Sequence, residues 1–195
     1  MDTLRLFLAI PIPEDVRAEL QTVQRHLQPF SPPRAVRWAR PEQFHLTLAF
    51  LGNVPAGRTD ALIQAVRPIC AATSPLRLKA NDVGFFPGAS SPRVFWVAIS
   101  DRDGLLPGLQ RQLAAAVLPF AQNQEARPFA SHVTLARLEK FDRRAAEKFV
   151  AGAKVFENKT FGEWTAAGVE LVRSQLLPSG AQHEAIEVFN TREPS

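Results

Sequence analysis

The 195-residue sequence contains a single cysteine, Cys70, one methionine and no tyrosine. A lone cysteine cannot form an internal disulfide or a cysteine-based metal cluster, which favours a reducing, cytoplasmic setting. No stretch reaches 18 uninterrupted apolar residues, so the sequence excludes a membrane-spanning helix. The N-terminal segment has only a short apolar run and carries an acid at Asp2, so we interpret it as a first strand rather than a signal peptide.

Lysine is also scarce, because 18 of the 23 basic residues are arginines. Hydrophobic residues make up 46% of the chain and charged residues 22%, which is the balance of a folded globular domain. Arginine recognises phosphate in a planar, bidentate geometry, so the net charge of +4 fits a phosphate-bearing ligand. A general compositional bias explains most of these arginines equally well. No block of like charges supports a tail that binds polyanions.

An internal repeat is the strongest feature of the sequence. Residues 40–49 read R-P-E-Q-F-H-L-T-L-A and residues 127–136 read R-P-F-A-S-H-V-T-L-A, with six identities at fixed offsets. A similar β-branched and aromatic run precedes each segment, R-L-F-L-A-I at 5–10 and R-V-F-W-V-A-I at 93–99. Repetition of both the motif and its surroundings indicates a duplicated unit.

The apolar periodicity predicts the order β-α-β-α-β twice, followed by a closing strand at 185–190. The expected helices cover residues 14–27, 58–72, 105–118 and 143–151, and the expected further strands cover 76–85 and 165–171. We therefore predict one α+β domain over residues 1–195. It is expected to consist of repeat halves at about 5–87 and 93–172, forming two lobes that face each other.

Side chains alternate along a strand, so His45 and Thr47 should face one side while Leu46 and Leu48 face the other. The second motif has the same pattern, with His132 beside its own threonine. If a pseudo-two-fold axis relates the halves, one cleft holds two imidazoles and two hydroxyls.

These residue types favour acid–base chemistry on a phosphate. Imidazole titrates near neutrality, so one histidine can act as a base while the other is a protonated acid. Threonine hydroxyls bind phosphate oxygens without adding negative charge. The four-residue His-x-Thr-x cores at 45–48 and 132–135 contain no carboxylate, so we predict metal-free catalysis on a phosphodiester, with a strained cyclic one favoured. The alternative for a single His-x-Thr is a hydrogen-bonded structural pair. His26 and His183 lie outside the repeat, and surface or structural roles are favoured for both.

Five segments of the chain carry a family resemblance. In order along the sequence they are R-L-F-L-A-I-P-I-P, R-W-A-R-P-E-Q-F-H-L-T-L-A-F-L-G, V-G-F-F-P-G-A-S-S-P-R-V-F-W, R-P-F-A-S-H-V-T-L-A-R and G-V-E-L-V-R-S-Q-L-L-P-S-G. Together they resemble the two-histidine (2H) phosphoesterases, and within them the RNA 2′,3′-cyclic phosphodiesterases, also called 2′-5′ RNA ligases. The resemblance covers essentially the whole chain. It implies two antiparallel-sheet lobes with outer helices and a central cleft between pseudo-two-fold related halves.

The resemblance also implies an activity that needs no metal and no nucleotide cofactor. A 2′,3′-cyclic phosphate is hydrolysed to a 2′-phosphate, with weak, reversible, ATP-independent 2′-5′ ligation. By this resemblance His132 is the proton acceptor that activates water, and His45 is the proton donor to the departing 3′ oxygen. Thr47 and Thr134 would hold the phosphate. Because the reverse reaction exchanges the two histidines, their assignment depends on the direction of the reaction.

Two further residues are candidates for substrate contacts. Five residues after the histidine the first motif has Phe50 and the second has Arg137, and the resemblance implies that this arginine lies near the phosphate. Strict alternation puts Arg137 on the face opposite His132, so this role requires a bulge or a strand end. A surface ion pair is the alternative. Phe86 matches an aromatic position of the family and is a candidate for stacking on a base, with core packing as its alternative.

The sequence departs from the family pattern at Ser131, where proline is usual, and at His183, where tyrosine is common. The expected substrates are RNA ends or small cyclic nucleotides, bound by a monomer without membrane or obligate protein partners. One alternative keeps the fold but acts on ADP-ribose 1″,2″-cyclic phosphate or on 2′,5′-oligonucleotides. Another is a non-catalytic RNA or nucleotide binder, which is disfavoured because both motifs are complete.

Overall fold

The computed structural model describes residues 2–32, 34–122, 128–139, 142–177 and 180–192. The α-helices in this part of the chain are α1 (Glu14–Leu27), α2 (Thr59–Ala72), α3 (Leu106–Val117) and α4 (Arg143–Ala153). The strands are β1 (Thr3–Pro11), β2 (Val36–Trp38), β3 (His45–Pro55), β4 (Leu76–Phe86), β5 (Val94–Asp101), β6 (His132–Leu138), β7 (Thr160–Ala166), β8 (Gly168–Leu177) and β9 (Gly180–Asn190). Short 3-10 helices are η1 (Gln28–Phe30), η2 (Pro41–Gln43), η3 (Ala56–Arg58) and η4 (Lys154–Phe156). No α-helix within the described ranges has the length and apolar character needed to cross a membrane.

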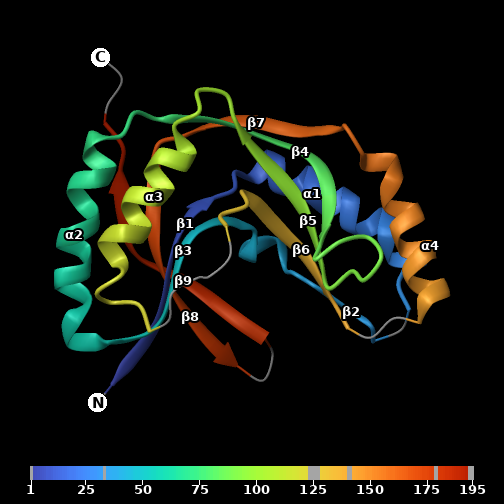
Figure 1. Cartoon of the computed structure of the whole chain (residues 1–195), viewed down its shortest axis with the longest axis horizontal. Coiled ribbons are helices and arrows are strands. Elements are labelled where there is room, and N and C mark those ends of the chain that lie inside the picture. Colours follow the sequence, from blue (N-terminus) through green and yellow to red (C-terminus); the bar gives the residue numbers. More distant parts are fainter. Residues whose placement is uncertain (1, 33, 123–127, 140–141, 178–179, 193–195) are drawn as a thin grey trace.

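Two antiparallel sheets form the two lobes of the molecule (Figure 1). Sheet A has the strand order β3-β1-β8-β9, and sheet B has the order β2-β6-β5-β4-β7. Helices α2 and α3 pack against each other and against β9 and β3 of sheet A, while α1 and α4 lie on the side of sheet B. The predicted α+β fold, with two antiparallel-sheet lobes and outer helices, is confirmed.

The halves of the sequence exchange elements between the lobes. Strand β4 follows β3 in the chain but pairs with β5 and β7 in sheet B, whereas β8 and β9 return to pair beside β1 in sheet A. Helix α1 follows β1 of sheet A yet packs against β7 of sheet B. Each lobe therefore contains strands from both halves of the chain.

The predicted strand at 165–171 is wrong. The chain leaves β7 at Ala166 in sheet B and enters β8 at Gly168 in sheet A, with Ala167 between them. A side chain at Gly168 would put a Cβ 2.9 Å from the carbonyl oxygen of Phe189, so glycine allows the close approach of β9 just after the change of sheet. Both runs are extended, so their periodicity could not reveal the change. The closing strand is also longer than expected, because β9 begins at Gly180.

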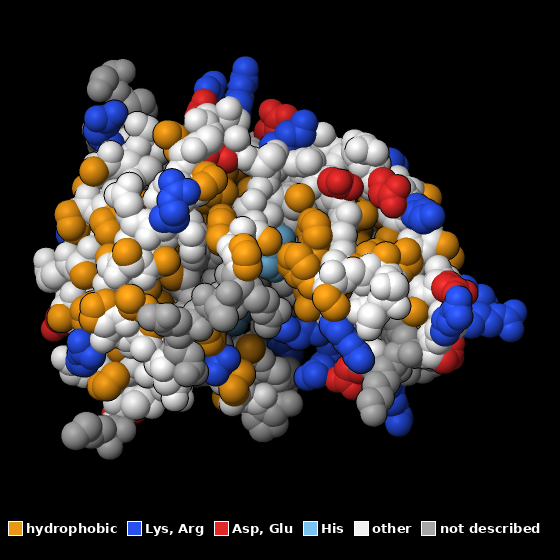
Figure 2. All heavy atoms as spheres, viewed as in Figure 1, with side chains coloured by type: hydrophobic (Ala, Val, Ile, Leu, Met, Phe, Trp, Pro, Cys, Tyr) orange, Lys and Arg blue, Asp and Glu red, His pale blue; other side chains and the backbone are white. Residues whose placement is uncertain are grey.

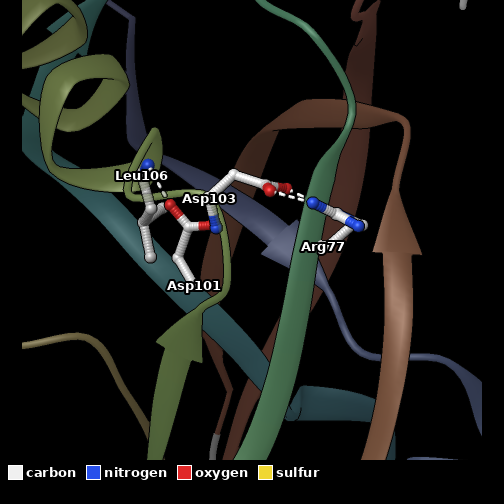
Figure 3. Close-up of polar contacts among 4 residues, drawn as sticks. All are labelled: Arg77, Asp101, Asp103 and Leu106. Carbon is white, nitrogen blue, oxygen red and sulfur yellow. Dashed lines mark hydrogen bonds and ion pairs between the residues drawn. The ribbon is translucent and has the colours of Figure 1, made fainter.

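A polar network fixes the start of α3 beside β4 (Figure 3). The Asp101 carboxylate accepts a hydrogen bond from the Leu106 amide, the first of the helix, at 2.6 Å and another from the Asp103 amide at 3.1 Å. Asp103 in turn pairs with both ends of the Arg77 guanidinium on β4, with Nε to Oδ2 at 2.7 Å. These bonds satisfy an unpaired N–H group at the helix start and connect α3 of one lobe to a strand of the other.

Candidate active site

The two repeated motifs begin two strands, one in each lobe. Strand β3 starts at His45 in sheet A, and β6 starts at His132 in sheet B. The two strands contact each other at the boundary between the lobes. In the space-filling view, histidine side chains are visible in the middle of the face, with hydrophobic side chains around them and arginine or lysine side chains gathered below (Figure 2). The fold thus brings the motifs together from positions far apart in sequence.

Alternation along these strands sorts the motif side chains as predicted. The aliphatic members are 0–2% exposed and belong to the main core: Leu46, Leu48, Val133 and Leu135. Both histidines and both threonines of the motifs are half-buried on the opposite face. Each motif therefore presents one imidazole and one hydroxyl away from the core.

Each motif histidine is held by a backbone carbonyl two residues earlier in the chain. His45 Nδ1 lies 2.6 Å from the Gln43 oxygen, and His132 Nδ1 lies 2.7 Å from the Ala130 oxygen. A carbonyl only accepts hydrogen bonds, so Nδ1 donates in both cases. In the neutral rings Nε2 is then the acceptor, and it is the nitrogen that remains for a substrate. The two sites share the same tautomer and the same anchoring.

Burial lowers the pKa of both imidazoles. Desolvation is the main cause for His45, whose pKa falls to about 4, and the positive charges of protonated His183 and His132 lower it further. Desolvation also lowers the pKa of His132, with a smaller contribution from the Arg137 guanidinium. The Gln43 and Ala130 carbonyls act in the opposite direction. The two motif histidines are therefore close enough for the charge of one to affect the other.

A β-bulge places Arg137 on the face that carries His132. The ladder between β5 and β6 skips Leu135: its neighbours Thr134 and Ala136 pair with consecutive residues of β5. The extra residue shifts the alternation by one, so Arg137 is exposed and faces the same way as the motif histidine. This is the bulge that the predicted role of Arg137 requires.

Strand β3 has a matching bulge at Leu48 against β1. Phe50 therefore occupies the position that Arg137 has in the other lobe, and it is 41% exposed. The Arg5 guanidinium lies over its ring, 4.7 Å from the centroid. The two walls of the site thus differ, because one presents a guanidinium and the other an aromatic ring covered by an arginine.

Phe86 lies beside the second histidine. Its ring meets His132 edge-on at 5.0 Å between centroids and stacks on Trp96 at 4.9 Å. A Cβ on Gly84 would lie 2.2 Å from the Trp96 ring, so only glycine leaves room for the indole at this point. The neighbouring Phe85 packs against the core instead. Phe86 is therefore part of the site that contains His132.

Comparison with known proteins shows the family to which the chain belongs. The model of one family, described as LigT-like phosphoesterase, matches residues 10–96 and 100–182, which together make up most of the chain. The protein belongs to the LigT-like phosphoesterase family. Each matched segment contains one of the two histidine motifs. The family resemblance expected from the sequence is confirmed.

Relatives of this LigT-like phosphoesterase share most of its length. An RNA 2′,3′-cyclic phosphodiesterase of Thermus thermophilus is 34% identical over 97% of this chain and 91% of its own. Another, of Archaeoglobus fulgidus, is 26% identical over 95% of this chain and 99% of its own. Among solved structures, TT0787 of Thermus thermophilus has a TM-score of 0.79 at 30% identity, covering 97% of this chain and 98% of that one. Escherichia coli LigT complexed with 3′-AMP, at 23% identity and a TM-score of 0.76, covers 97% of this chain and 99% of that one and shares the fold.

His183 is a residue of the site that sequence reasoning missed. Strand β9 places its ring 5.3 Å from His45 and 5.1 Å from Phe7, measured between centroids. The repeat has no histidine at the corresponding place, and the signal that could have found it is the aromatic residue common there in the family. His26, in contrast, lies on α1 between Phe30 and Phe156.

Ser131, the other departure from the family pattern, joins β6 to β5. Its hydroxyl donates a hydrogen bond to the Ile99 carbonyl at 2.6 Å, and its own carbonyl accepts one from the Ile99 amide at 3.0 Å. These two hydrogen bonds anchor the chain immediately before His132. Ser131 therefore restrains the backbone before the motif through hydrogen bonds. A proline has no side-chain donor and would restrain the backbone through its ring.

Other candidate sites lie apart from the two motifs. Within the described ranges, no group of three or more His, Cys, Asp or Glu side chains is arranged to hold a metal ion. A hollow of about 1000 Å³ lies between the end of α1 and α4 and includes His26, and another of about 660 Å³ lies between residues 89–93 and α4. Neither is lined by a residue of the two motifs.

Proposed function

We propose that this LigT-like phosphoesterase hydrolyses the 2′,3′-cyclic phosphate at RNA ends to a 2′-phosphomonoester, with His45 and His132 as the acid–base pair. The observation that carries the proposal is the matched anchoring of these two histidines, which leaves Nε2 of each for the substrate. The names of the curated relatives support the substrate class. The same chemistry with an RNA 5′-hydroxyl in place of water would give 2′-5′ ligation.

In the proposed reaction, His132 Nε2 takes a proton from water while the water oxygen forms a bond to phosphorus. The bond between phosphorus and O3′ breaks, and His45 Nε2 gives its proton to O3′. The products are a 2′-phosphate and a free 3′-hydroxyl. If the 5′-hydroxyl of a second RNA replaces water, the product is a 2′-5′ phosphodiester, and the opened cyclic phosphate supplies the free energy without ATP.

His45 has to take up a proton when the substrate binds. In the free protein burial lowers the pKa of His45 to about 4, so the ring is neutral near pH 7. A bound phosphodiester carries a negative charge, and an opposite charge nearby raises the pKa of an imidazole. Substrate binding therefore favours the protonated form of the proposed acid.

The remaining contacts are proposed for the phosphate and the base. The hydroxyls of Thr47 and Thr134 would donate to non-bridging oxygens, and the Arg137 guanidinium would stabilise the charge that develops on them in the transition state. Phe86, already stacked on Trp96, would extend that stack to the terminal base. A single chain contributes both motifs, so we propose a monomer. We also propose that it acts in the cytoplasm without metal or nucleotide cofactor.

The pH dependence of the reaction follows from the two lowered pKa values. Productive binding requires one protonated and one neutral imidazole, and both groups of the free protein titrate below their ordinary value of 6.5. We expect kcat/KM to be bell-shaped with its maximum below pH 6.5, because both rings are protonated at lower pH and both are neutral at higher pH. Steady-state rates on 2′,3′-cyclic AMP across this range test it. A profile that rises continuously through neutrality would contradict the proposed pair.

Removing the guanidinium next to His132 should weaken the transition state. We expect Arg137→Gln to lower kcat by about 100-fold, in the range found when one donor to developing charge is lost. It should also raise the pKa of His132, since a positive neighbour is removed. The matched control is Arg143→Gln on α4, where the side chain is 94% exposed and pairs with Glu147. Equal activity of the two variants would refute the role of Arg137.

The substrate class is tested by a side-by-side assay. An oligoribonucleotide ending in a 2′,3′-cyclic phosphate, ADP-ribose 1″,2″-cyclic phosphate and a 2′,5′-linked oligonucleotide are offered at matched concentrations. The proposal predicts the highest kcat/KM on the RNA end. A higher kcat/KM on either of the other two compounds would contradict the proposed substrate, although the proposed histidine pair would stand.

A further inference from the structure

His45 is touched by two rings that come from different strands of sheet A. Phe7 of β1 stacks on it, with 4.7 Å between centroids and 29° between planes. His183 of β9 meets it edge-on, with 5.3 Å between centroids and 71° between planes. Phe7 and His183 also contact each other edge-on at 5.1 Å. The three rings form a closed cluster that limits rotation of the His45 imidazole.

Gln43 connects the two histidines of this cluster through its backbone and its side chain. Its carbonyl accepts the Nδ1 hydrogen bond of His45 at 2.6 Å. Its side-chain amide donates to the carbonyl of Ala181, two residues before His183 on β9. The start of β9 is thereby attached to the segment that orients His45, so the contact between the two imidazoles is built into the fold.

His132, the other motif histidine, is also enclosed by two rings, but neither of them can take up a proton. Phe86 and Trp96 meet His132 edge-on, with centroids at 5.0 Å and 6.2 Å. Neither of these rings titrates in the ordinary pH range. In the first lobe one of the two enclosing rings can take up a proton, and that ring is His183.

We propose that His183 is a positioning residue for His45: its edge and the Phe7 face hold the imidazole in its reactive orientation, and the contact between the two imidazoles couples their protonation. The assignment of His45 as the acid rests on the proposed function. The contact between the three rings is observed and does not depend on that function.

The charged groups around the cluster support this role. In the described part of the chain, the titratable groups that act on His45 are His183 from β9 and His132 from β6. Strand β1 contributes the apolar Phe7, and η2 contributes the neutral Gln43 carbonyl. Burial lowers the pKa of His183 as well, so the ring is neutral at pH 7. Once His183 is protonated, a second positive charge on His45 is opposed by repulsion between adjacent imidazolium ions.

The direct test is an NMR titration of the imidazole nitrogens in protein labelled with ¹⁵N-histidine. The chain has four histidines, and single variants assign their signals. His183→Phe replaces one ring by another of similar size, so it preserves the enclosure of His45 and removes the charge. The titration midpoint of His45 should rise above its native pKa of about 4 in this variant, because the charge of His183 no longer lowers it, although burial, the larger cause, remains. An unchanged midpoint would overturn the coupling. The matched control is His26→Phe, which should leave the midpoint where it is.

The positioning role is tested by kinetics on 2′,3′-cyclic AMP. His183→Ala removes the edge contact, and we expect kcat to fall by about 10-fold with KM nearly unchanged, as for a slightly misplaced reactive group. His183→Phe should recover most of the lost kcat. Gln43→Leu, which frees β9 from η2, should reproduce the loss seen with alanine. Wild-type kcat in His183→Ala, or failure of phenylalanine to rescue a folded variant, would overturn the role.

The NMR titration and the kinetic measurements separate this proposal from the function on which it rests. If the wild-type protein opens no cyclic phosphate, the proposed function fails, while the NMR midpoint still decides whether His183 acts on His45. If turnover is normal and the midpoint does not move, the function stands and the role of His183 fails.

Discussion

Replacing His45 or His132 by asparagine is expected to lower kcat by about 1000-fold or more, because each variant loses a group that moves a proton in the transition state. Asparagine is the informative substitution at these positions. Its side-chain amide can still donate to the Gln43 or Ala130 carbonyl, as Nδ1 does in the native protein. It has no counterpart of Nε2. Single-turnover rates with an RNA oligonucleotide ending in a cyclic phosphate measure the effect on chemistry alone.

The double variant and a third histidine provide the controls. Groups that act as a unit are strongly non-additive, so the variant lacking both His45 and His132 should be little slower than either single variant. His26→Asn removes an imidazole that also lies between aromatic rings, but on α1 and away from the motifs. It should retain wild-type turnover. A single motif variant that keeps its activity within about 10-fold of wild type would contradict the acid–base pair.

Replacing Thr47 or Thr134 by valine is expected to lower kcat/KM by about 100-fold in each case, the cost of removing one donor to the phosphate oxygens. Valine has nearly the same shape as threonine and favours strands, so the half-buried positions on β3 and β6 keep their packing. The loss should appear with RNA ends and with 2′,3′-cyclic nucleotides alike, since the hydroxyls would contact the phosphate that both substrates share.

A control on another strand separates loss of the hydroxyl from loss of stability. Thr165 on β7 is exposed and pairs with Arg77 at the edge of sheet B, outside the site. Thr165→Val should leave turnover unchanged. Urea unfolding should place all three valine variants near wild type. If a motif variant loses activity only in proportion to its loss of folded protein, the phosphate contact is refuted.

The placement of the motif side chains could be predicted because it depends on local geometry. Alternation along a strand is enough to put His45 and Thr47 on one face and the leucines between them in the core. The same rule showed that Arg137 requires a bulge to reach the histidine face, and the skipped residue is Leu135. The bulge itself has no signature in the composition of the strand, so its position is known only from the pairing with β5.

The rest of the site depends on contacts between distant parts of the chain. His183 reaches His45 because β8 and β9 cross into sheet A, and the change of sheet at Ala167 separates two runs that are both extended. Periodicity reports the local conformation and not the partner strand, which is why residues 165–171 read as one strand. The link between Gln43 and Ala181 joins residues 138 positions apart, and no local pattern contains it.

The central claim is that two histidines open a cyclic phosphate toward the 2′-phosphate. The most direct measurement is a product-resolved assay of an oligoribonucleotide ending in a 2′,3′-cyclic phosphate, in excess EDTA, with the 2′- and 3′-phosphate products separated by chromatography. The predicted result is complete conversion to the 2′-phosphate at a rate that EDTA does not change. Exclusive formation of the 3′-phosphate, or turnover that begins only when a metal ion is added, would contradict the account.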